Sequence, residues 1–363
     1  MCDGGMQMNF DAKTRAYFDN KVKQVFVYIT SRCQLRCRQC LYKPLLCNES
    51  TDIDFYTLVD LLKEFYKYGA YKISFLGGEP TLYNDKENGK NFGDVIEEVK
   101  KIGYKYIRVD TNGQFENSFL DEPKIKLLDE ITFSLDGHDE NTNDVVRGKG
   151  TYNRCVNNIK YAVLKGYKVQ ITSCVHNYSC PDKYKGIENL KKMIKFAESL
   201  GVYSINFHPI LKVGIARDTW IENTDIMPDT WKNIYEELIG LILGEEFKIK
   251  VRIPMRFCQK ENAILSRERY FYCPLEMGER ALIMPDGQIK VCAFTIGTDA
   301  CVARYDSERV YFEEKNNETT QIGTLDKGFL CYNQKTNSES LIPLCMSYKP
   351  YQSELVWEDI TNG

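Results

Sequence analysis

Six short β-branched or aromatic runs alternate with amphipathic segments between residues 24 and 208. The predicted strands are 24–30, 72–76, 106–110, 131–135, 169–175 and 203–208, and the predicted helices are 54–68, 93–102, 123–129, 152–164 and 187–200. When each strand is followed by a helix and then by the next strand, the strands of the sheet run parallel to one another and the connections are right-handed crossovers. The pattern therefore predicts an α/β fold, either an open sheet or a full or partial barrel, with its chemistry at the carboxyl ends of the strands.

The alternation stops after residue 208. A further helix is expected at 231–243, and cysteines then return among turn residues and short strands. This change of pattern places a domain boundary between about residues 210 and 270. The predicted organisation is an N-terminal extension at 1–22, a barrel domain at 23–225, a connecting helical segment at 226–270 and a smaller cysteine-rich domain at 271–363.

The chain has 14 cysteines and 3 histidines in 363 residues. It lacks the basic head and apolar run of a signal peptide, and no apolar stretch is long enough to span a bilayer. We therefore expect cytoplasmic, reduced thiols that serve metal or redox chemistry. A formal charge of −3, from 48 basic and 51 acidic residues, also predicts that neither nucleic acid nor a membrane is a partner.

Three cysteines follow the first predicted strand with the spacing Cys33-x3-Cys37-x2-Cys40. Three thiolates on one tight loop can hold three corners of a [4Fe–4S] cluster and leave the fourth iron open for a ligand. A zinc knuckle and loop cysteines without a metal are the alternatives. A structural zinc site needs four ligands, and the next cysteine, Cys47, follows in a different rhythm, so the spacing favours the cluster.

Further motifs follow the next strands. They are GGEP at 77–80, DTNG at 110–113, SLDG at 134–137 and RGKGTY at 147–152. With the cysteine loop, they resemble the radical S-adenosylmethionine (SAM) superfamily over about residues 24–210. The resemblance implies a partial (β/α)6 TIM-like barrel in which Cys33, Cys37 and Cys40 hold the SAM-binding cluster. It also implies reductive cleavage of SAM to a 5′-deoxyadenosyl radical that abstracts a substrate hydrogen atom.

The same resemblance assigns SAM contacts to residues at the strand ends. Glu79 is the polar anchor of the segment that supports the SAM amino group, and Arg147 pairs with the SAM carboxylate. Ser134 and Asp136 bond the ribose or the carboxylate. The implied set is completed by Gly77, Gly78, Pro80, Thr111 and Asn112. Turn formation and ordinary surface charge remain the alternative for these residues.

One position departs from the family pattern. Many members carry an aromatic residue near the adenine immediately before the third cysteine, where this chain has Gln39. Tyr42 is a candidate to replace part of that contact.

A second group of cysteines lies in the C-terminal part. Cys273 and Cys292 flank Gly287, and a tight turn between two short strands brings two such thiolates together. The spacing resembles the SPASM or twitch extensions of radical SAM enzymes, which bind auxiliary iron–sulfur clusters. The dense second half of a SPASM set is absent, which favours a twitch-type domain with one auxiliary [4Fe–4S] cluster.

The ligands implied for that cluster are Cys273, Cys292, Cys345 and Cys331. Cys258, Cys301 or an open position are alternatives for the fourth ligand. The alternative to an auxiliary cluster is a degenerate extension that binds no metal and keeps its cysteines as small buried residues.

Three residues end the fifth and sixth predicted strands, where a substrate chamber is expected: Cys174, His176 and His208. Cys174 is the candidate catalytic residue, which would return a hydrogen atom, and a histidine there can relay a proton. Packed core is the alternative.

An auxiliary cluster suits an oxidation, because it can accept the electron that a substrate radical loses. We therefore expect oxidative modification of a peptide or protein side chain, with an electron donor such as flavodoxin or ferredoxin. Oxidation of a small-molecule alcohol or aminocyclitol in natural-product biosynthesis is the alternative. A second alternative is a non-catalytic iron–sulfur or zinc protein.

The two ends of the chain bear on the substrate. The 32 residues before Cys33 are too few for an appended leader-peptide-binding domain, so we expect the barrel itself or a separate partner to recognise a peptide. The C-terminus lacks a Gly-Gly tail, which disfavours a molybdenum-cofactor cyclase.

Overall fold

The computed structural model describes residues 8–46, 51–210, 224–244, 247–253, 256–259, 278–296, 301–313 and 341–344. The helices are α1 (Ala12–Phe18), α2 (Phe55–Lys67), α3 (Phe92–Ile102), α4 (Ser118–Asp121), α5 (Glu140–Arg147), α6 (Thr151–Leu164), α7 (Lys183–Ser199) and α8 (Pro228–Gly244). The strands of the main sheet are β1 (Asn9–Phe10), β2 (Gln24–Tyr28), β3 (Lys72–Leu76), β6 (Tyr106–Thr111), β7 (Glu130–Ser134), β8 (Val169–Val175), β9 (Ser204–Pro209), β10 (Lys250–Arg252), β12 (Arg280–Ile283), β13 (Gln288–Lys290), β14 (Ala303–Tyr305) and β15 (Arg309–Phe312). Two small ribbons pair β4 (Asn84–Asp85) with β5 (Lys90–Asn91) and β11 (Arg256–Gln259) with β16 (Leu341–Leu344).

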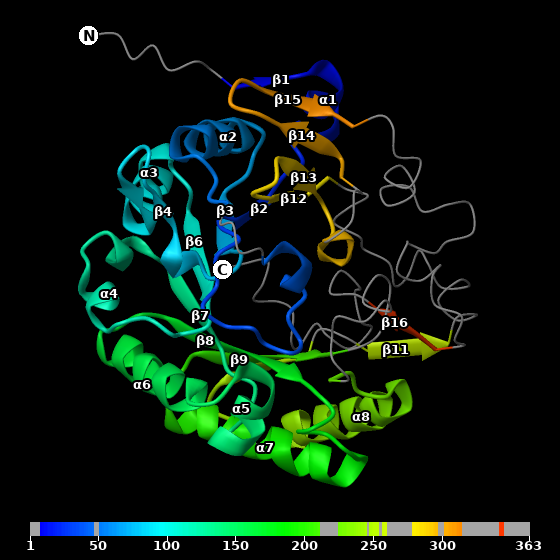
Figure 1. Ribbon diagram of the computed structural model, residues 1–363. Coiled ribbons are helices and arrows are strands. Elements are labelled where there is room, and N and C mark those ends of the chain that lie inside the picture. The colour runs from blue at the N-terminus through cyan, green and yellow to red at the C-terminus, as the bar shows by residue number, and fades with distance from the viewer. Residues whose placement is uncertain are drawn as a thin grey trace.

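The six predicted strands are all present and adjacent. Strands β2, β3, β6, β7, β8 and β9 pair in that order, every pair parallel, and β10 continues the sheet beyond β9. They form a curved wall with the helices on its outside (Figure 1). The predicted α/β fold with a partial (β/α)6 barrel is confirmed.

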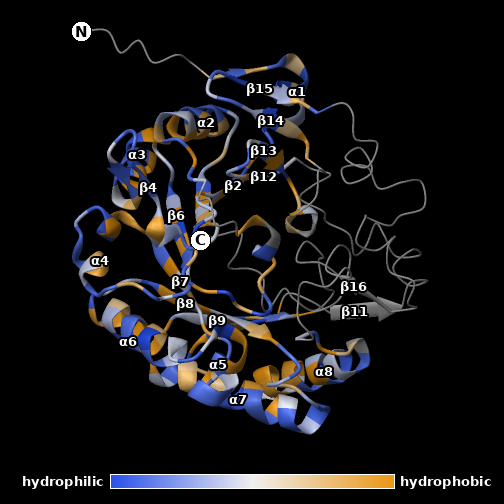
Figure 2. Ribbon diagram, viewed as in Figure 1, coloured by the Kyte–Doolittle hydropathy of each residue, from blue (hydrophilic) through white to orange (hydrophobic). Residues whose placement is uncertain are grey.

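Alternation along each strand separates the helix-facing side from the barrel interior. In β6, Ile107 and Val109 are fully buried in the main apolar core, whereas Tyr106, Arg108 and Asp110 are partly exposed on the other side. The helices present apolar faces to the same core, and orange and blue residues alternate along α6 and α7 in Figure 2. The polar side of the strands therefore lines the barrel interior, which we call the lumen.

The described C-terminal strands extend this sheet. Strand β12 pairs in parallel with β2, and β13, β14 and β15 follow it with antiparallel pairing. The N-terminal β1 then pairs with β15, and its Phe10 packs edge-on against Phe65 of α2. The open edge of β2 thus receives the C-terminal strands. The boundaries predicted at 22/23, 225/226 and 270/271 stay a prediction.

Three helical segments differ from the sequence expectation. Helix α1 follows an N-cap at Asp11, and α5 follows a capping box at Asp139, but neither was expected because each buries few apolar side chains. The predicted helix at 123–129 is instead a single 3₁₀ turn at Ile125–Leu127, which follows the short helix α4. Glu122, which precedes a proline, is extended there, as expected at such a position.

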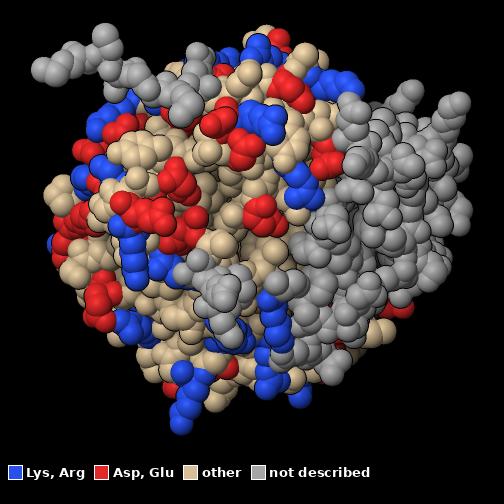
Figure 3. All heavy atoms as spheres, turned by 45° about the horizontal axis from the view of Figure 1, so that its top comes forward, with Lys and Arg blue, Asp and Glu red and all other residues tan. Residues whose placement is uncertain are grey.

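Basic and acidic side chains are both present on the described surface visible in Figure 3. Within the described residues, none of the helices has the length and apolar character needed to cross a bilayer.

Candidate functional site

The cysteine loop leaves the carboxyl end of β2 and lies across the ends of the neighbouring elements. The backbone N–H of Arg38 donates to the carbonyl of Val146 in α5 at 2.9 Å. The Asn112 amide, after β6, lies 3.7 Å from the Cys33 sulfur, and the Leu35 N–H lies 3.4 Å from it. The three loop thiols are therefore held where the parallel strands end, as the motif order predicts.

The three thiols are unpaired and partly buried. Burial raises the pKa of Cys33 to about 11 and that of Cys40 to about 12, with repulsion from the other two thiolates adding to the shift at Cys40. Burial also raises the pKa of Cys37, against the opposing positive charge of Arg147. The thiols stay protonated at neutral pH unless a metal provides positive charge.

This donor set fits an iron–sulfur cluster with three protein ligands. Three free thiols lie on one loop, and thiolate sulfur is the donor that such clusters use. Within the described residues, no group of three or more His, Cys, Asp or Glu side chains is placed to hold a single metal ion.

The segment Gly77–Pro80 docks directly on the start of the cysteine loop. The Gly78 N–H donates to the Thr30 carbonyl and the Glu79 N–H to the Arg32 carbonyl, both at 2.7 Å. A Cβ on Gly78 would lie 2.0 Å from the Arg32 carbonyl oxygen. The close approach of the two backbones therefore requires glycine at position 78.

Glu79 joins this segment to the end of β6. Its side chain is buried, and its carboxylate accepts from the Thr111 hydroxyl at 2.6 Å and the Asn112 N–H at 2.7 Å, as well as from Thr81. Burial raises the pKa of Glu79, whereas these hydrogen bonds oppose that shift. Glu79, Thr111 and Asn112 thus form one buried network below the cysteine loop. Their direct contact with SAM stays a prediction, as does that of Pro80.

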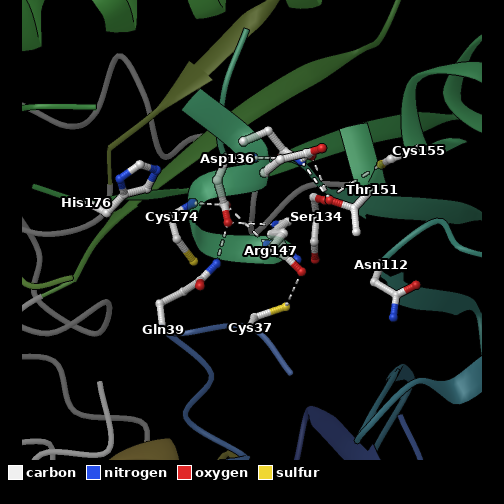
Figure 4. Close-up of polar contacts among 12 residues, drawn as sticks. Cys37, Gln39, Asn112, Ser134, Asp136, Arg147, Thr151, Cys155, Cys174 and His176 are labelled. Atoms are coloured by element: carbon white, nitrogen blue, oxygen red, sulfur yellow. Dashed lines mark hydrogen bonds and ion pairs between the residues drawn. The ribbon is translucent and has the colours of Figure 1, made fainter. Parts of the chain in front are cut away.

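Asp136 is the centre of a second buried network (Figure 4). Its carboxylate pairs with Arg147, at 2.6 Å from Nε, and accepts from the Cys174 N–H at 2.7 Å and from the Gln39 amide. The side chain of Asp136 is 0% exposed and that of Arg147 is 10% exposed. Ser134 lies two residues before Asp136 and is partly buried. The sequence predicted Asp136, Arg147, Cys174 and Ser134 as site residues, but it did not predict that Asp136 bonds to Arg147 and Cys174.

We expect Arg147→Met to destabilise the protein by about 3–5 kcal/mol, because it leaves the buried Asp136 carboxylate without its counter-charge. Chemical denaturation of the metal-free protein measures this loss. Arg154→Met is the matched control: the Arg154–Glu116 pair is 46% and 82% exposed, so its loss costs about 1 kcal/mol at most. Equal losses in the two variants would contradict the buried pair.

The three candidate chamber residues lie at the carboxyl ends of β8 and β9. Burial raises the pKa of Cys174, and the neighbouring Asp136 adds to the effect, so its thiol stays protonated. His176 is completely buried, and its Nδ1 accepts from the Ser179 N–H. Burial lowers the pKa of His208 to about 4, so its ring is neutral at neutral pH. A protonated thiol has the hydrogen atom that the predicted role of Cys174 requires, and that role stays a prediction.

An ion pair in the lumen was not expected from the sequence. Arg108 and Asp110 of β6 make a two-point contact, with Nε and Oδ1 2.9 Å apart, and their side chains are 21% and 24% exposed. Burial opposes the charge on Arg108, but the carboxylates of Asp110 and Glu130 hold its pKa above its ordinary value. The signal was present in the alternation of YIRVDT, where the polar residues share one face.

The predicted hairpin around Gly287 is confirmed. Strands β12 and β13 are antiparallel, and Gly287 has a φ of 81° in the turn. Cys292 follows β13 and is partly buried against the main apolar core.

Three of the other proposed auxiliary ligands, Cys273, Cys331 and Cys345, lie outside the described residues. Of the alternatives for the fourth ligand, Cys301 is buried beside β14 and Cys258 belongs to β11. The ligand set of the auxiliary cluster stays a prediction.

Residues 27–197 match the radical SAM superfamily. The chain carries a radical SAM domain. The match covers the cysteine loop and the following strand-end motifs, so the predicted family is confirmed. Radical SAM domains use a [4Fe–4S] cluster and SAM, which confirms the first two predicted cofactors and identifies the protein as an enzyme.

Similar curated sequences include GTP 3′,8-cyclases. The "Probable GTP 3′,8-cyclase" of Saccharolobus solfataricus is 23% identical over 283 residues, covering 76% of this chain and 84% of the relative. The GTP 3′,8-cyclase of Psychromonas ingrahamii is 28% identical over 174 residues, covering 47% of this chain and 49% of the relative.

Similar solved structures include two radical SAM proteins with peptides. Streptococcus suis SuiB bound to its precursor peptide SuiA gives a TM-score of 0.60 at 17% identity, covering 82% of this chain and 65% of SuiB. The protein anSMEcpe with bound AdoMet and Cp18Cys peptide gives 0.55 at 16% identity, covering 79% and 77%. These likenesses show the fold of the radical SAM domain. This chain spans less than two thirds of the length of SuiB.

Proposed function

We propose that this radical SAM enzyme oxidises a side chain of a peptide or protein substrate. Cys33, Cys37 and Cys40 would hold the SAM-binding [4Fe–4S] cluster. When bound, that cluster and SAM supply a 5′-deoxyadenosyl radical that abstracts a substrate hydrogen atom. The observation that carries the proposal is the set of three half-buried free thiols at the carboxyl end of a parallel barrel.

The chain's own residues would prepare this site by fixing the loop and presenting charge. The Gly78 and Glu79 amides fix the start of the loop on the barrel. Arg147 presents the positive charge that opposes the raised pKa of Cys37 and Cys40. Arg147 is thus placed to pair with the SAM carboxylate through the N–H groups that Asp136 leaves free.

The lumen supports a neutral polar substrate group. Because Asp110 already neutralises Arg108, the pair offers both donors and acceptors without net charge. A peptide amide has the matching donor and acceptor. The likeness to SuiB and anSMEcpe with bound peptides is a second support.

The curated relatives favour a second candidate, cyclisation of a purine nucleotide, because GTP 3′,8-cyclases align over 76% of this chain. Oxidation of a small-molecule alcohol is a third, and it would use the same radical-generating site. These reactions differ in substrate and share the first hydrogen abstraction.

The oxidation removes two electrons from the substrate. The radical takes one hydrogen atom, and one further electron and one proton then leave the substrate. We propose that Cys273, Cys292, Cys345 and Cys331 would hold an auxiliary [4Fe–4S] cluster, which would supply an acceptor for that electron. Flavodoxin or ferredoxin would be the external donor that starts each turnover.

Anaerobic reconstitution tests the proposal. Reduced enzyme with SAM is expected to form 5′-deoxyadenosine, and a peptide substrate to raise that rate and lose two hydrogens by mass spectrometry. Incubation with GTP is the parallel arm. No nucleoside product with any reductant would refute radical catalysis, while stimulation by GTP and no peptide would favour the cyclase reading.

Removal of the auxiliary ligands gives a separate expected result. Cys273→Ala and Cys292→Ala should each lower the iron content by about one cluster and leave the SAM-binding cluster in place. Iron and sulfide analysis measures this. An iron content equal to that of the wild type would exclude the auxiliary site.

A further inference from the structure

Gln39 lies in the cysteine loop between two of the three cysteines and has no part in the proposed SAM contacts. Its side chain is 7% exposed, and its Nε2 donates to Oδ2 of Asp136. The reverse orientation of the amide would set its carbonyl oxygen against a carboxylate, so electrostatics fixes the donor toward Asp136. The buried Oε1 has no hydrogen-bond partner among the described residues. The bond to Asp136 is therefore the contact that orients this side chain.

Asp136 is bonded from three separate parts of the chain. Arg147 reaches it from the end of α5, and the Cys174 N–H reaches it from β8. Both belong to the barrel wall. Gln39 comes from the cysteine loop and rises toward the same carboxylate in Figure 4. The carboxylate thus links the loop to two elements of the barrel.

The two ends of the cysteine loop are held in different ways. Its start is held by the backbone of Gly77–Glu79 and by Asn112 against Cys33. The stretch from Cys37 to Cys40 is held by four contacts outside the loop. The Arg38 N–H donates to α5, the Arg38 guanidinium donates to the Tyr178 hydroxyl at 3.1 Å, the Cys37 sulfur makes a weak 3.9 Å contact with the Arg147 carbonyl, and the Gln39 side chain donates to Asp136. Of these, the Gln39 contact is the one made to a buried carboxylate.

We propose that Gln39 is a positioning residue that fastens the Cys37–Cys40 stretch to Asp136. The bond keeps both cysteines against the barrel end before any cluster is present, so the ligands are ordered in advance. Because the acceptor is charged and buried, loss of the Gln39–Asp136 hydrogen bond shifts the equilibrium between the closed and the open loop by about tenfold or more. Gln39→Leu removes the donor at similar volume.

Alkylation of the metal-free protein tests this role. Iodoacetamide labelling, followed by mass spectrometry of the loop peptides, gives a separate rate for each cysteine. We expect Gln39→Leu to raise the rates of Cys37 and Cys40 by about tenfold and to change Cys33 less. Hydrogen exchange at the Arg38 and Cys40 amides should increase in parallel, which distinguishes opening of the loop from a change in thiol ionisation.

Gln34→Leu is the matched control. Gln34 is the same residue type on the same loop, but it is exposed, and its amide donates to the Gln114 carbonyl at 3.1 Å. We expect it to leave the rates of Cys37 and Cys40 within about twofold, as for other exposed contacts. Gln39→Asn, which keeps the amide but shortens its reach, gives a second variant, and circular dichroism confirms that each variant folds.

The proposal rests on the cysteine loop of the proposed function, yet its readouts need neither cluster nor SAM. Absence of SAM cleavage by the wild type would refute the function and leave the positioning role intact. Unchanged alkylation and exchange in folded Gln39→Leu, or an equal increase in Gln34→Leu, would overturn the positioning role alone.

Discussion

Cys37→Ala is expected to remove the SAM-binding cluster and with it the formation of 5′-deoxyadenosine. The remaining two loop thiols cannot hold three corners of the cluster. Loss of an outer hydrogen-bond partner typically costs a metal site about 10–100-fold, and loss of a ligand costs more. Iron analysis after anaerobic reconstitution should fall by about one cluster, and chromatography should find product at the background level.

Cys180→Ala is the control for that substitution. Cys180 is also a buried free cysteine, but it follows β8, outside the cysteine loop, and its sulfur contacts the Ser179 hydroxyl. We expect a small loss of stability and an unchanged iron content, because a buried cysteine outside a metal site behaves as a small apolar residue. Full iron occupancy in Cys37→Ala would refute the assignment of the loop.

Gly78→Ala has the second large expected effect, in which the segment 77–80 no longer docks on the cysteine loop. The new Cβ would lie 2.0 Å from the Arg32 oxygen and 2.5 Å from the Arg32 carbonyl carbon. Both atoms are backbone, so no side-chain rotation relieves the overlap. Overpacking of this kind costs about 1–3 kcal/mol and occasionally more, and here it also breaks the Gly78–Thr30 and Glu79–Arg32 hydrogen bonds.

Denaturant unfolding of the metal-free Gly78→Ala protein measures the loss, and retention of iron after gel filtration measures its effect on the loop. Gly240→Ala serves as the control. Gly240 lies in α8, and a Cβ added there would meet no atom within 4 Å, so alanine should stabilise the helix by about 0.5–1 kcal/mol. A Gly78→Ala protein with the unfolding midpoint of the wild type would contradict the close backbone approach.

Local sequence determined the order of the elements well. Strands β3 and β8 were predicted to the residue, because each is a short apolar or β-branched run bounded by polar and turn residues. The motifs that begin at Cys33, Gly77 and Ser134 were placed at strand ends for the same reason, and parallel topology then requires them to meet. Helices α1 and α5 were not predicted, because an N-cap and tertiary contacts stabilise them and neither has an apolar stripe that the sequence would reveal.

The sequence by itself determined that this chain carries a radical SAM domain, because cysteine spacing and the motif after each strand can be read from short segments. Only the tertiary structure decided what those residues contact. Gln39 and Asp136 are 97 residues apart and belong to different motifs, and their bond depends on how the barrel closes around the loop. The pairing of β12 with β2 likewise joins strands far apart in the chain, which no local pattern encodes.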